Sequence, residues 1–182
     1  MKLVRALFLF ITVSSSVVTF AGDKNGSVKI VASRDVPLQR TGFYPAKIHS
    51  QCTTAALLAR TCWKVWAAAS QTFDKKAKNL KVLVNVTIPS SSSNDFTYAA
   101  LVFAIDGEVT QIPPTDWTGS DPYIYGRTAT IEDESLARKL ARATEVWVTV
   151  LLENRISVKL DPKQIAGISA VVNAYDSLDP QR

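Results

Sequence analysis

Alternating apolar and polar positions predict several β-strands in this chain. The clearest alternation runs over residues 80–88, and its aliphatic positions are Leu80, Val82, Val84, Val86 and Ile88. Because side chains alternate between the two faces of a strand, this spacing places them on one face that can be buried. Residues 96–105 are apolar on both faces, which favours a central strand that returns beside 80–88 after a polar turn. Shorter strands are expected over 28–32 and 127–131.

Two tight turns are also predicted. Asp106-Gly107 is a strong signal for a two-residue hairpin turn after the strand at 96–105. Residues 146–160 predict a second hairpin with one aliphatic face. A three-residue loop there pairs Val150 with Val158, whereas a two-residue loop would set Val150 beside Ser157. We therefore expect the three-residue loop.

Two stretches near the C-terminus predict helices. Asp161-Pro162 followed by Gln164 supplies an N-cap, a proline suited to the first turn and a capping-box partner. The apolar positions after it recur at helical spacing, at Ile165, Ile168, Val171, Val172 and Tyr175. We expect this helix to lie on the aliphatic face of the 146–160 hairpin. A second helix is expected over 132–143, with an acidic start and with Leu136 and Leu140 buried.

Residues 53–72 allow two interpretations. Apolar residues recur there at alternating spacings of three and four, at Ala55, Leu58, Cys62, Val65 and Ala69, which favours a helix. The aromatic-rich stretch 61–66 is more typical of a strand. We expect the helix, because alanines flank that stretch on both sides.

Together these elements predict one α+β domain over residues 22–182. It would contain a mainly antiparallel sheet of six or seven strands, with two or three helices packed on one face. The expected core comprises Leu80, Val82, Val84, Val86, Val148, Val150, Val158, Ile165 and Ile168. Residues 35–50, which contain Pro37, Gly42 and Pro45, are expected to form a connecting loop.

The N-terminus predicts export from the cytoplasm. Residues 1–21 have a basic start at Lys2 and Arg5, an apolar stretch, and a small-x-small cleavage motif before Gly22. No later stretch is apolar enough over 18 residues to cross a membrane. We therefore expect a periplasmic or secreted protein with no transmembrane segment after cleavage.

Charge is distributed unevenly along the chain. Residues 22–94 hold 11 Lys or Arg against 3 acidic residues, whereas residues 95–182 hold 8 against 13. The charges could simply intermix on the folded surface. Alternatively, they could create a basic face that meets an anionic envelope surface or partner. We find no nucleic-acid-binding motif.

Few residues suggest catalysis. His49 is the only histidine, so a catalytic triad or a multi-histidine metal site lacks parts, and no cofactor motif is present. Cys52 could act as the nucleophile of a small cell-envelope hydrolase, or it could form a disulfide with Cys62. A straight helix would hold these two cysteines about 15 Å apart, too far for a bridge. We therefore expect no bridge. Glu132, Asp133 and Glu134 are explained as a helix start.

The long loop 113–126 is the candidate binding site. It gathers aromatic and acidic residues, namely Asp116, Trp117, Asp121, Tyr123 and Tyr125. Such a mixture suits sugars or peptides, whereas the alternative is that the rings fold back as a lid over the sheet edge, since such rings bury readily. The sequence thus favours a non-enzymatic exported domain that binds an unknown protein or an envelope glycan.

Overall fold

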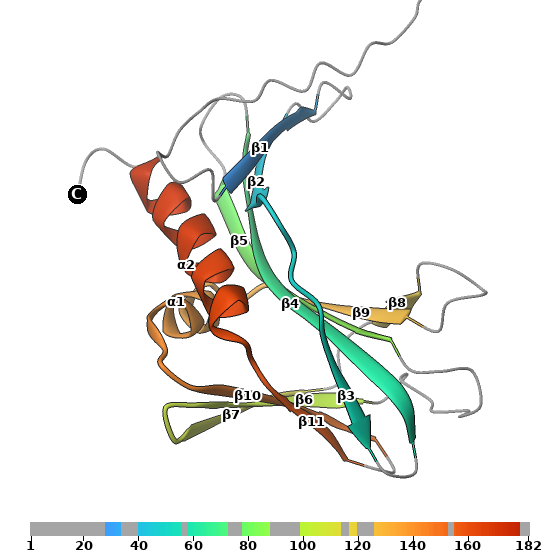
Figure 1. The fold of residues 1–182 in the computed structure, drawn as a ribbon. Helices are drawn as coiled ribbons and strands as arrows, with labels where there is room; N and C mark the ends of the chain where they lie inside the picture. Colours follow the sequence, from blue (N-terminus) through green and yellow to red (C-terminus); the bar gives the residue numbers. More distant parts are fainter. Residues whose placement is uncertain are drawn as a thin grey trace, which may run out of the picture.

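The computed structural model describes residues 28–33, 40–55, 58–72, 78–87, 99–113, 117–119, 126–152 and 155–178. Within these ranges the chain forms two antiparallel β-sheets and two helices (Figure 1). The signal peptide expected at residues 1–21 lies outside the described residues.

The larger sheet has seven strands in the order β1-β2-β4-β5-β9-β8, with β3 added beside β4. The strands are β1 (Val28–Ser33), β2 (Arg40–Pro45), β3 (Gln51–Ala55), β4 (Leu58–Thr72), β5 (Lys78–Thr87), β8 (Trp117–Gly119) and β9 (Gly126–Ile131). β4, which has 15 residues, pairs with β2 at one end, with β3 at the other and with β5 along much of its length. The sheet is therefore organised around β4.

The helix expected over 53–72 is wrong, because this region forms the β3–β4 hairpin. Along β4 the buried inner positions follow a period of two, at Trp63, Val65, Ala67, Ala69 and Gln71. The alanines that favoured a helix are accommodated in the strand because their small side chains let a helix approach the sheet closely. Tertiary packing overrides their helix propensity here.

A second layer packs against one face of this sheet. It contains β6 (Ala100–Ile105), β7 (Glu108–Ile112), β10 (Val146–Leu151) and β11 (Ile156–Lys159), which form a four-stranded sheet in the order β11-β10-β6-β7. It also contains α1 (Glu134–Arg142) and α2 (Pro162–Ser177). In Figure 1 both helices lie against the upper part of the large sheet, and the small sheet crosses below them. One hydrophobic core joins the two layers.

The expected α+β class is confirmed, but the expectation of one sheet is corrected. Strands β5 and β6 do not form a hairpin: β5 pairs with β4 and β9, while β6 lies between β10 and β7. The number of strands in the larger sheet, seven, matches the upper expectation. The sequence interpretation also missed β2, which falls in the stretch expected to be a loop.

Most of the predicted core is confirmed. Eight of the nine expected residues are at most 3% exposed, and Ile165 is partly buried against the same cluster. The Asp106-Gly107 turn is also confirmed: it joins β6 to β7, and both residues have positive φ (49° and 90°). That geometry is the one that the Asp-Gly pair favours.

The hairpin β10–β11 has the expected face but a different register. Val150 pairs with Ile156 and Val148 with Val158, so the strands are shifted by two residues from the expected pairing. A shift of two keeps every side chain on its face, because the side-chain period of a strand is two. The aliphatic residues of both strands are accordingly buried.

Helix α2 begins as the sequence predicts. Asp161 caps it by accepting a hydrogen bond from the backbone N of Lys163, and the Gln164 side chain bonds back to the N-cap backbone. Its position is different from the prediction, however. The helix packs on β4, β2 and β1 rather than on the β10–β11 hairpin. Gly167 of this helix faces Pro45 of β2, and a Cβ there would make an ordinary contact of 3.5 Å with the Pro45 side chain.

Candidate functional site

Of the five residues predicted as a binding loop, only Trp117 lies within the described part of the chain. Asp116, Asp121, Tyr123 and Tyr125 lie outside it. Trp117 begins β8 and pairs with Ala129, a residue with no exposure, so it occupies the inner side of the large sheet. Its Nε1 donates a hydrogen bond of 3.1 Å to the Ala99 carbonyl beside β6. This contact links the two layers. For this one ring it agrees with the interpretation of the loop as a lid that folds back on the sheet.

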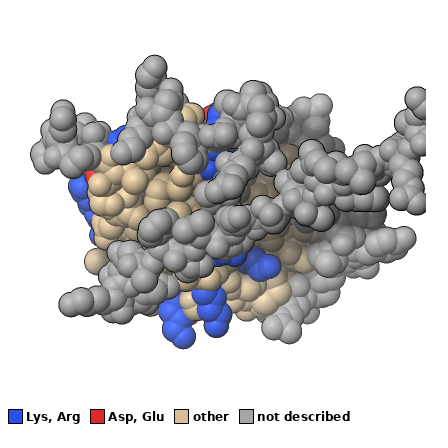
Figure 2. Space-filling view, turned by 90° about the horizontal axis from the view of Figure 1, so that it is seen from above, with Lys and Arg blue, Asp and Glu red and all other residues tan. Residues whose placement is uncertain are grey.

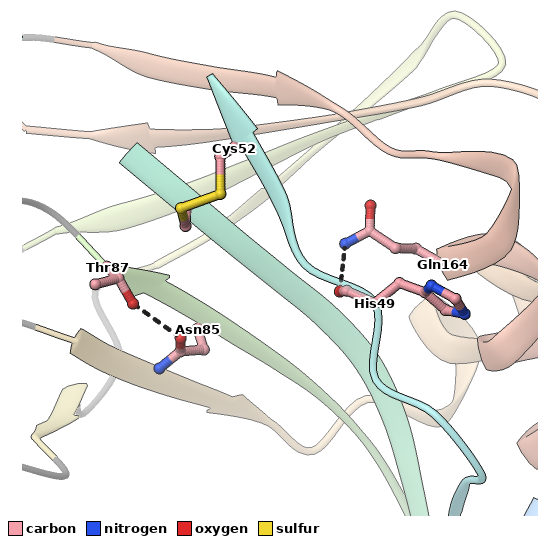
Figure 3. The surroundings of a disulfide bond; sticks show 6 residues. His49, Cys52, Asn85, Thr87 and Gln164 are labelled. Atoms are coloured by element: carbon pink, nitrogen blue, oxygen red, sulfur yellow. Dashed lines mark hydrogen bonds between the residues drawn. A yellow bond between two sulfur atoms is a disulfide. The ribbon is translucent and has the colours of Figure 1, made fainter. Parts of the chain in front are cut away.

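The cysteine prediction is wrong, because Cys52 and Cys62 form a disulfide (Figure 3). They sit directly opposite each other on β3 and β4, with Cα atoms 4.0 Å apart. The argument against a bridge assumed a straight helix, and a strand pair brings the same residues together. Cys52 has no free thiol in this arrangement, so it cannot serve as a hydrolase nucleophile.

The remaining candidate residues of the sequence have structural roles. His49 lies between β2 and β3, and its carbonyl accepts a hydrogen bond of 3.4 Å from the buried Gln164 side chain (Figure 3). Asp133 caps α1 by accepting a 2.9 Å hydrogen bond from the backbone N of Leu136. The helix-start interpretation of this acidic cluster is thus confirmed. Among the described residues, no three His, Cys, Asp or Glu side chains gather in a group that could hold a metal ion.

A different surface stands out: the face of the seven-stranded sheet turned away from the second layer, here called the outer face. Strand alternation places on it the residues between the buried ones. On β4 and β5 these are Cys62, Lys64, Trp66, Ala68, Ser70, Asn79, Lys81, Leu83, Asn85 and Thr87. No described helix or strand packs against this face (Figure 1).

The charge of the large sheet has one sign. Its seven strands contain no Asp or Glu, and their basic residues are Lys29, Arg40, Arg60, Lys64, Lys78, Lys81 and Arg127. The first acidic residue after β9 is Glu132, just beyond the strand end. By register, Lys29, Arg40, Lys64 and Lys81 belong to the outer face. Lys78 instead belongs to the inner side, with its Nζ 5.6 Å from the centre of the Tyr175 ring.

The second layer has mixed charge. Its described residues, 99–113 and 132–178 without 153–154, hold 6 Lys or Arg and 8 Asp or Glu. Many of these charges are paired. Arg138 of α1 lies 2.6 Å from Glu134 and 2.7 Å from Asp176, and these two partners raise the pKa of its guanidinium. A groove of about 470 Å³ along α1 is lined by Glu134, Ser135, Arg138, Lys139 and Arg142, three basic residues and one acidic one. In Figure 2, which views the molecule from above, blue Lys and Arg atoms outnumber red acidic ones on the described surface.

Two carboxylates of the second layer are fixed by specific partners. Asp106 accepts hydrogen bonds from the Thr144 hydroxyl (2.7 Å) and from the backbone N of Glu145 and Thr144, and these lower its pKa. Glu145 accepts from Lys159 and from Trp147 Nε1, which lowers its pKa as well. The contacts of Asp106 link the turn between β6 and β7 to the residues just before β10.

Aromatic side chains interrupt the basic outer face. Trp66 pairs with Leu83, which pairs with Thr130, and this row crosses three strands. Lys64 follows two residues away on the same strand, and Lys81 lies diagonally across on β5. Such neighbours have Cα atoms about 7–8 Å apart, so both lysine side chains can reach the ring.

A second ring, that of Tyr44, lies on the same face. A Cβ built on Gly42 would meet the Tyr44 ring at 2.7 Å, so this ring lies back across the backbone of β2. Tyr44 is 39% exposed and pairs with Lys29 of β1. Gly42 itself pairs with Ser70 of β4, which is four residues from Trp66. The outer face therefore presents two aromatic side chains with a lysine near each.

Comparison of the chain with protein-family models, with curated proteins and with solved structures found no match. Neither described helix is long and apolar enough to span a membrane.

The charge asymmetry between the two halves of the sequence was the signal that could have located the outer face. It was not assigned to a surface, because the misassigned helix at 53–72 removed β4 from the sheet.

Proposed function

We propose that the protein is an exported, non-enzymatic binding domain that holds an anionic partner on the outer face of its seven-stranded sheet. The observation that carries this proposal is the charge of that sheet, whose strands contain no Asp or Glu and place Lys29, Arg40, Lys64 and Lys81 on the outer face. Export rests on the sequence of residues 1–21. The hydrolase alternative required a free thiol at Cys52, and Cys52 is bonded to Cys62 in a disulfide.

The physical argument concerns repulsion between like charges. Lysines and arginines gathered on one face of strands that contain no Asp or Glu repel one another, which destabilises the folded state. An anionic partner removes that repulsion, and the gain contributes to binding. Electrostatic attraction also speeds encounter and weakens with added salt, because ions screen charges beyond about 10 Å at 0.1 M. A partner held this way would be an acidic protein or an anionic glycan of the envelope.

The loop 113–126 remains a second proposed contact. Asp116, Trp117, Asp121, Tyr123 and Tyr125 keep their proposed role as a ligand-binding group, although the hydrogen bond of Trp117 to Ala99 favours the lid for that ring. The two surfaces call for different partners, since the loop contributes acidic residues and the sheet only basic ones. We propose the sheet as the main site because the register gathers lysines and aromatic rings on one of its faces.

The test compares two double variants that change net charge equally. Lys64→Glu/Lys81→Glu reverses two charges of the outer face, whereas Arg155→Glu/Lys163→Glu reverses two exposed charges of the second layer. Binding to dextran sulfate, a simple polyanion, is measured at several salt concentrations. We expect the first variant to bind at least about tenfold more weakly and the second to stay within about twofold of the unmodified protein. Equal losses in both variants would show that net charge alone is responsible and would overturn the proposal.

A further inference from the structure

We infer that the anionic partner is an acidic polysaccharide, laid along β4 with Trp66 and Tyr44 as stacking surfaces for its sugar rings. This inference rests on the proposed function and names the class of its ligand. It follows from the arrangement of rings, lysines and small side chains on the outer face, taken in turn below.

The spacing between Tyr44 and Trp66 suits an extended chain of sugar units. Tyr44 lies across Gly42, which pairs with Ser70, and Trp66 lies four residues from Ser70 on β4. At the rise of a strand this separation is about 13 Å, which suits a chain of sugar units better than a single sugar. Of the outer positions of β4 between them, Ala68 is buried by its neighbours and Ser70 is partly exposed.

Aromatic faces suit the hydrogen-rich faces of sugar rings. The face of an aromatic ring is negative, so it attracts the weakly positive C–H groups that a pyranose presents on one side. The Tyr44 ring lies over Gly42 and the side chain is 39% exposed, so a ligand lying along the sheet can contact it. The same rings offer little to an extended acidic peptide, which would gain more by pairing with an open strand edge.

The flanking groups match the carboxylates and hydroxyls of an acidic sugar. Lys64 and Lys81 stand on two sides of Trp66, and Lys29 pairs with Tyr44. Polar side chains fill the row next to Trp66, where Lys64, Asn85 and Thr128 pair across the strands. The Asn85 amide donates a 2.9 Å hydrogen bond to the Thr128 hydroxyl. Within the described part of the chain its second hydrogen has no acceptor, so it can donate to a sugar hydroxyl. A ligand with one carboxylate per sugar would meet a cation near each ring.

An anionic membrane surface is the competing ligand, and the face fits it less well. Membrane-surface binding relies on apolar side chains that project beyond the basic residues. Trp66 and Leu83 are only partly exposed and lie among polar rows. The most exposed large apolar side chain of the described residues, Val109 at 71%, belongs to the second layer.

The experiment measures binding of the purified protein to polygalacturonate, a polymer of uronic acid, at one fixed salt concentration. Dextran serves as the neutral polymer and phosphatidylglycerol vesicles as the anionic membrane. The variants are Trp66→Thr, which keeps a good strand former, and Trp66→Phe, which keeps an aromatic face. Trp147→Thr, on the outer side of the small sheet, is the matched control, and thermal unfolding verifies that each variant folds.

We expect binding to polygalacturonate and none to dextran. Trp66→Thr should weaken binding by about five- to tenfold, while Trp66→Phe and Trp147→Thr stay within about twofold. If Trp66→Thr binds normally and Lys64→Glu/Lys81→Glu does not, the stacking inference fails and the proposed function stands. Preference for the vesicles over the polymer would also overturn the inference alone. No binding to any polyanion would overturn both.

Discussion

The seven-stranded sheet and the layer packed on it bury their inner faces in the same way but present different outer surfaces. Each inner face is a row of aliphatic and aromatic side chains in one core. Outside, the large sheet is basic with no acidic residue in its strands, whereas the small sheet presents a row of Val109, Ala104, Trp147 and Lys159. Glu145, two residues before Trp147, contacts both Lys159 and Trp147 of that row.

This contrast separates structural from functional charge. In the second layer, acids and bases satisfy each other, as in the contacts of Arg138 with Glu134 and Asp176. Exposed pairs of this kind contribute little to stability but neutralise the surface. The large sheet has no acidic residue of its own to do the same for Lys64 and Lys81. A sheet whose described strands carry basic residues and no acidic ones is the better candidate for an anionic ligand.

The largest expected effect distinguishes the two faces of the large sheet. Val84 of β5 has no exposure, so Val84→Asp would bury an unpaired charge and lower the free energy of unfolding by about 4 kcal/mol or more. Asn85→Asp introduces the same charge one residue later on the outer face. We expect it to cost less than about 1 kcal/mol. Urea denaturation of both variants measures the difference, and a similar midpoint for the two would refute the assigned faces.

Two tryptophans allow the next test, because one joins the layers and the other does not. Trp117 packs on the core and bonds to Ala99, so Trp117→Ala should lower stability by about 3 kcal/mol. Trp147 is 43% exposed, and Trp147→Ala should cost clearly less. If Trp117→Ala is nearly neutral in thermal unfolding but abolishes ligand binding, the loop 113–126 rather than the sheet is the site.

The disulfide should have the next largest effect. Replacing both cysteines with alanine removes a cross-link over a short loop, and we expect a loss of about 2–3 kcal/mol. Non-reducing mass spectrometry should first show the oxidised protein at about two mass units below the dithiol form, the two lost thiol hydrogens. The double variant should still bind polyanions, since β4 keeps its pairing with β5. Loss of binding in a folded double variant would place the site at the β3–β4 hairpin instead.

The smallest effect concerns pH. The donors around Asp106 hold its pKa below its ordinary value of 3.8, so it stabilises the fold above that value, and this contribution is lost as pH falls through the lowered pKa. Asp106→Asn keeps a residue suited to the turn but removes the charge. Its melting temperature should therefore fall less steeply between about pH 4 and pH 2 than that of the unmodified protein. Identical slopes would show that these hydrogen bonds do not favour the charged form.

Local patterns in the sequence predicted much of the fold. The alternation at 80–88, the capping box at Asp161 and the Asp106-Gly107 turn depend on neighbours in the chain, and each is found in the structure. What could not be predicted depends on distant partners. The alanines of β4 become strand residues because α2 packs over them, and β5 pairs with β9 rather than with the next strand along the chain.

The candidate site was hidden for the same reason. Lys64 and Trp66 lie on one strand, Lys81 on another and Tyr44 on a third, and only the register brings them to one face. The excess of basic residues before residue 95 was visible in the sequence, but it could not be assigned to a surface without β4. The predicted loop was chosen because its aromatic and acidic residues are adjacent in the chain.

Lysine protection tests the central claim most directly. The protein is acetylated briefly with and without bound dextran sulfate, and the modified lysines are quantified by mass spectrometry. Our account predicts that bound polyanion protects Lys29, Lys64 and Lys81 on the outer face, while Lys139, Lys159 and Lys163 of the second layer react at unchanged rates. Equal protection of both sets, or protection of the second layer alone, would contradict the assignment of binding to the seven-stranded sheet.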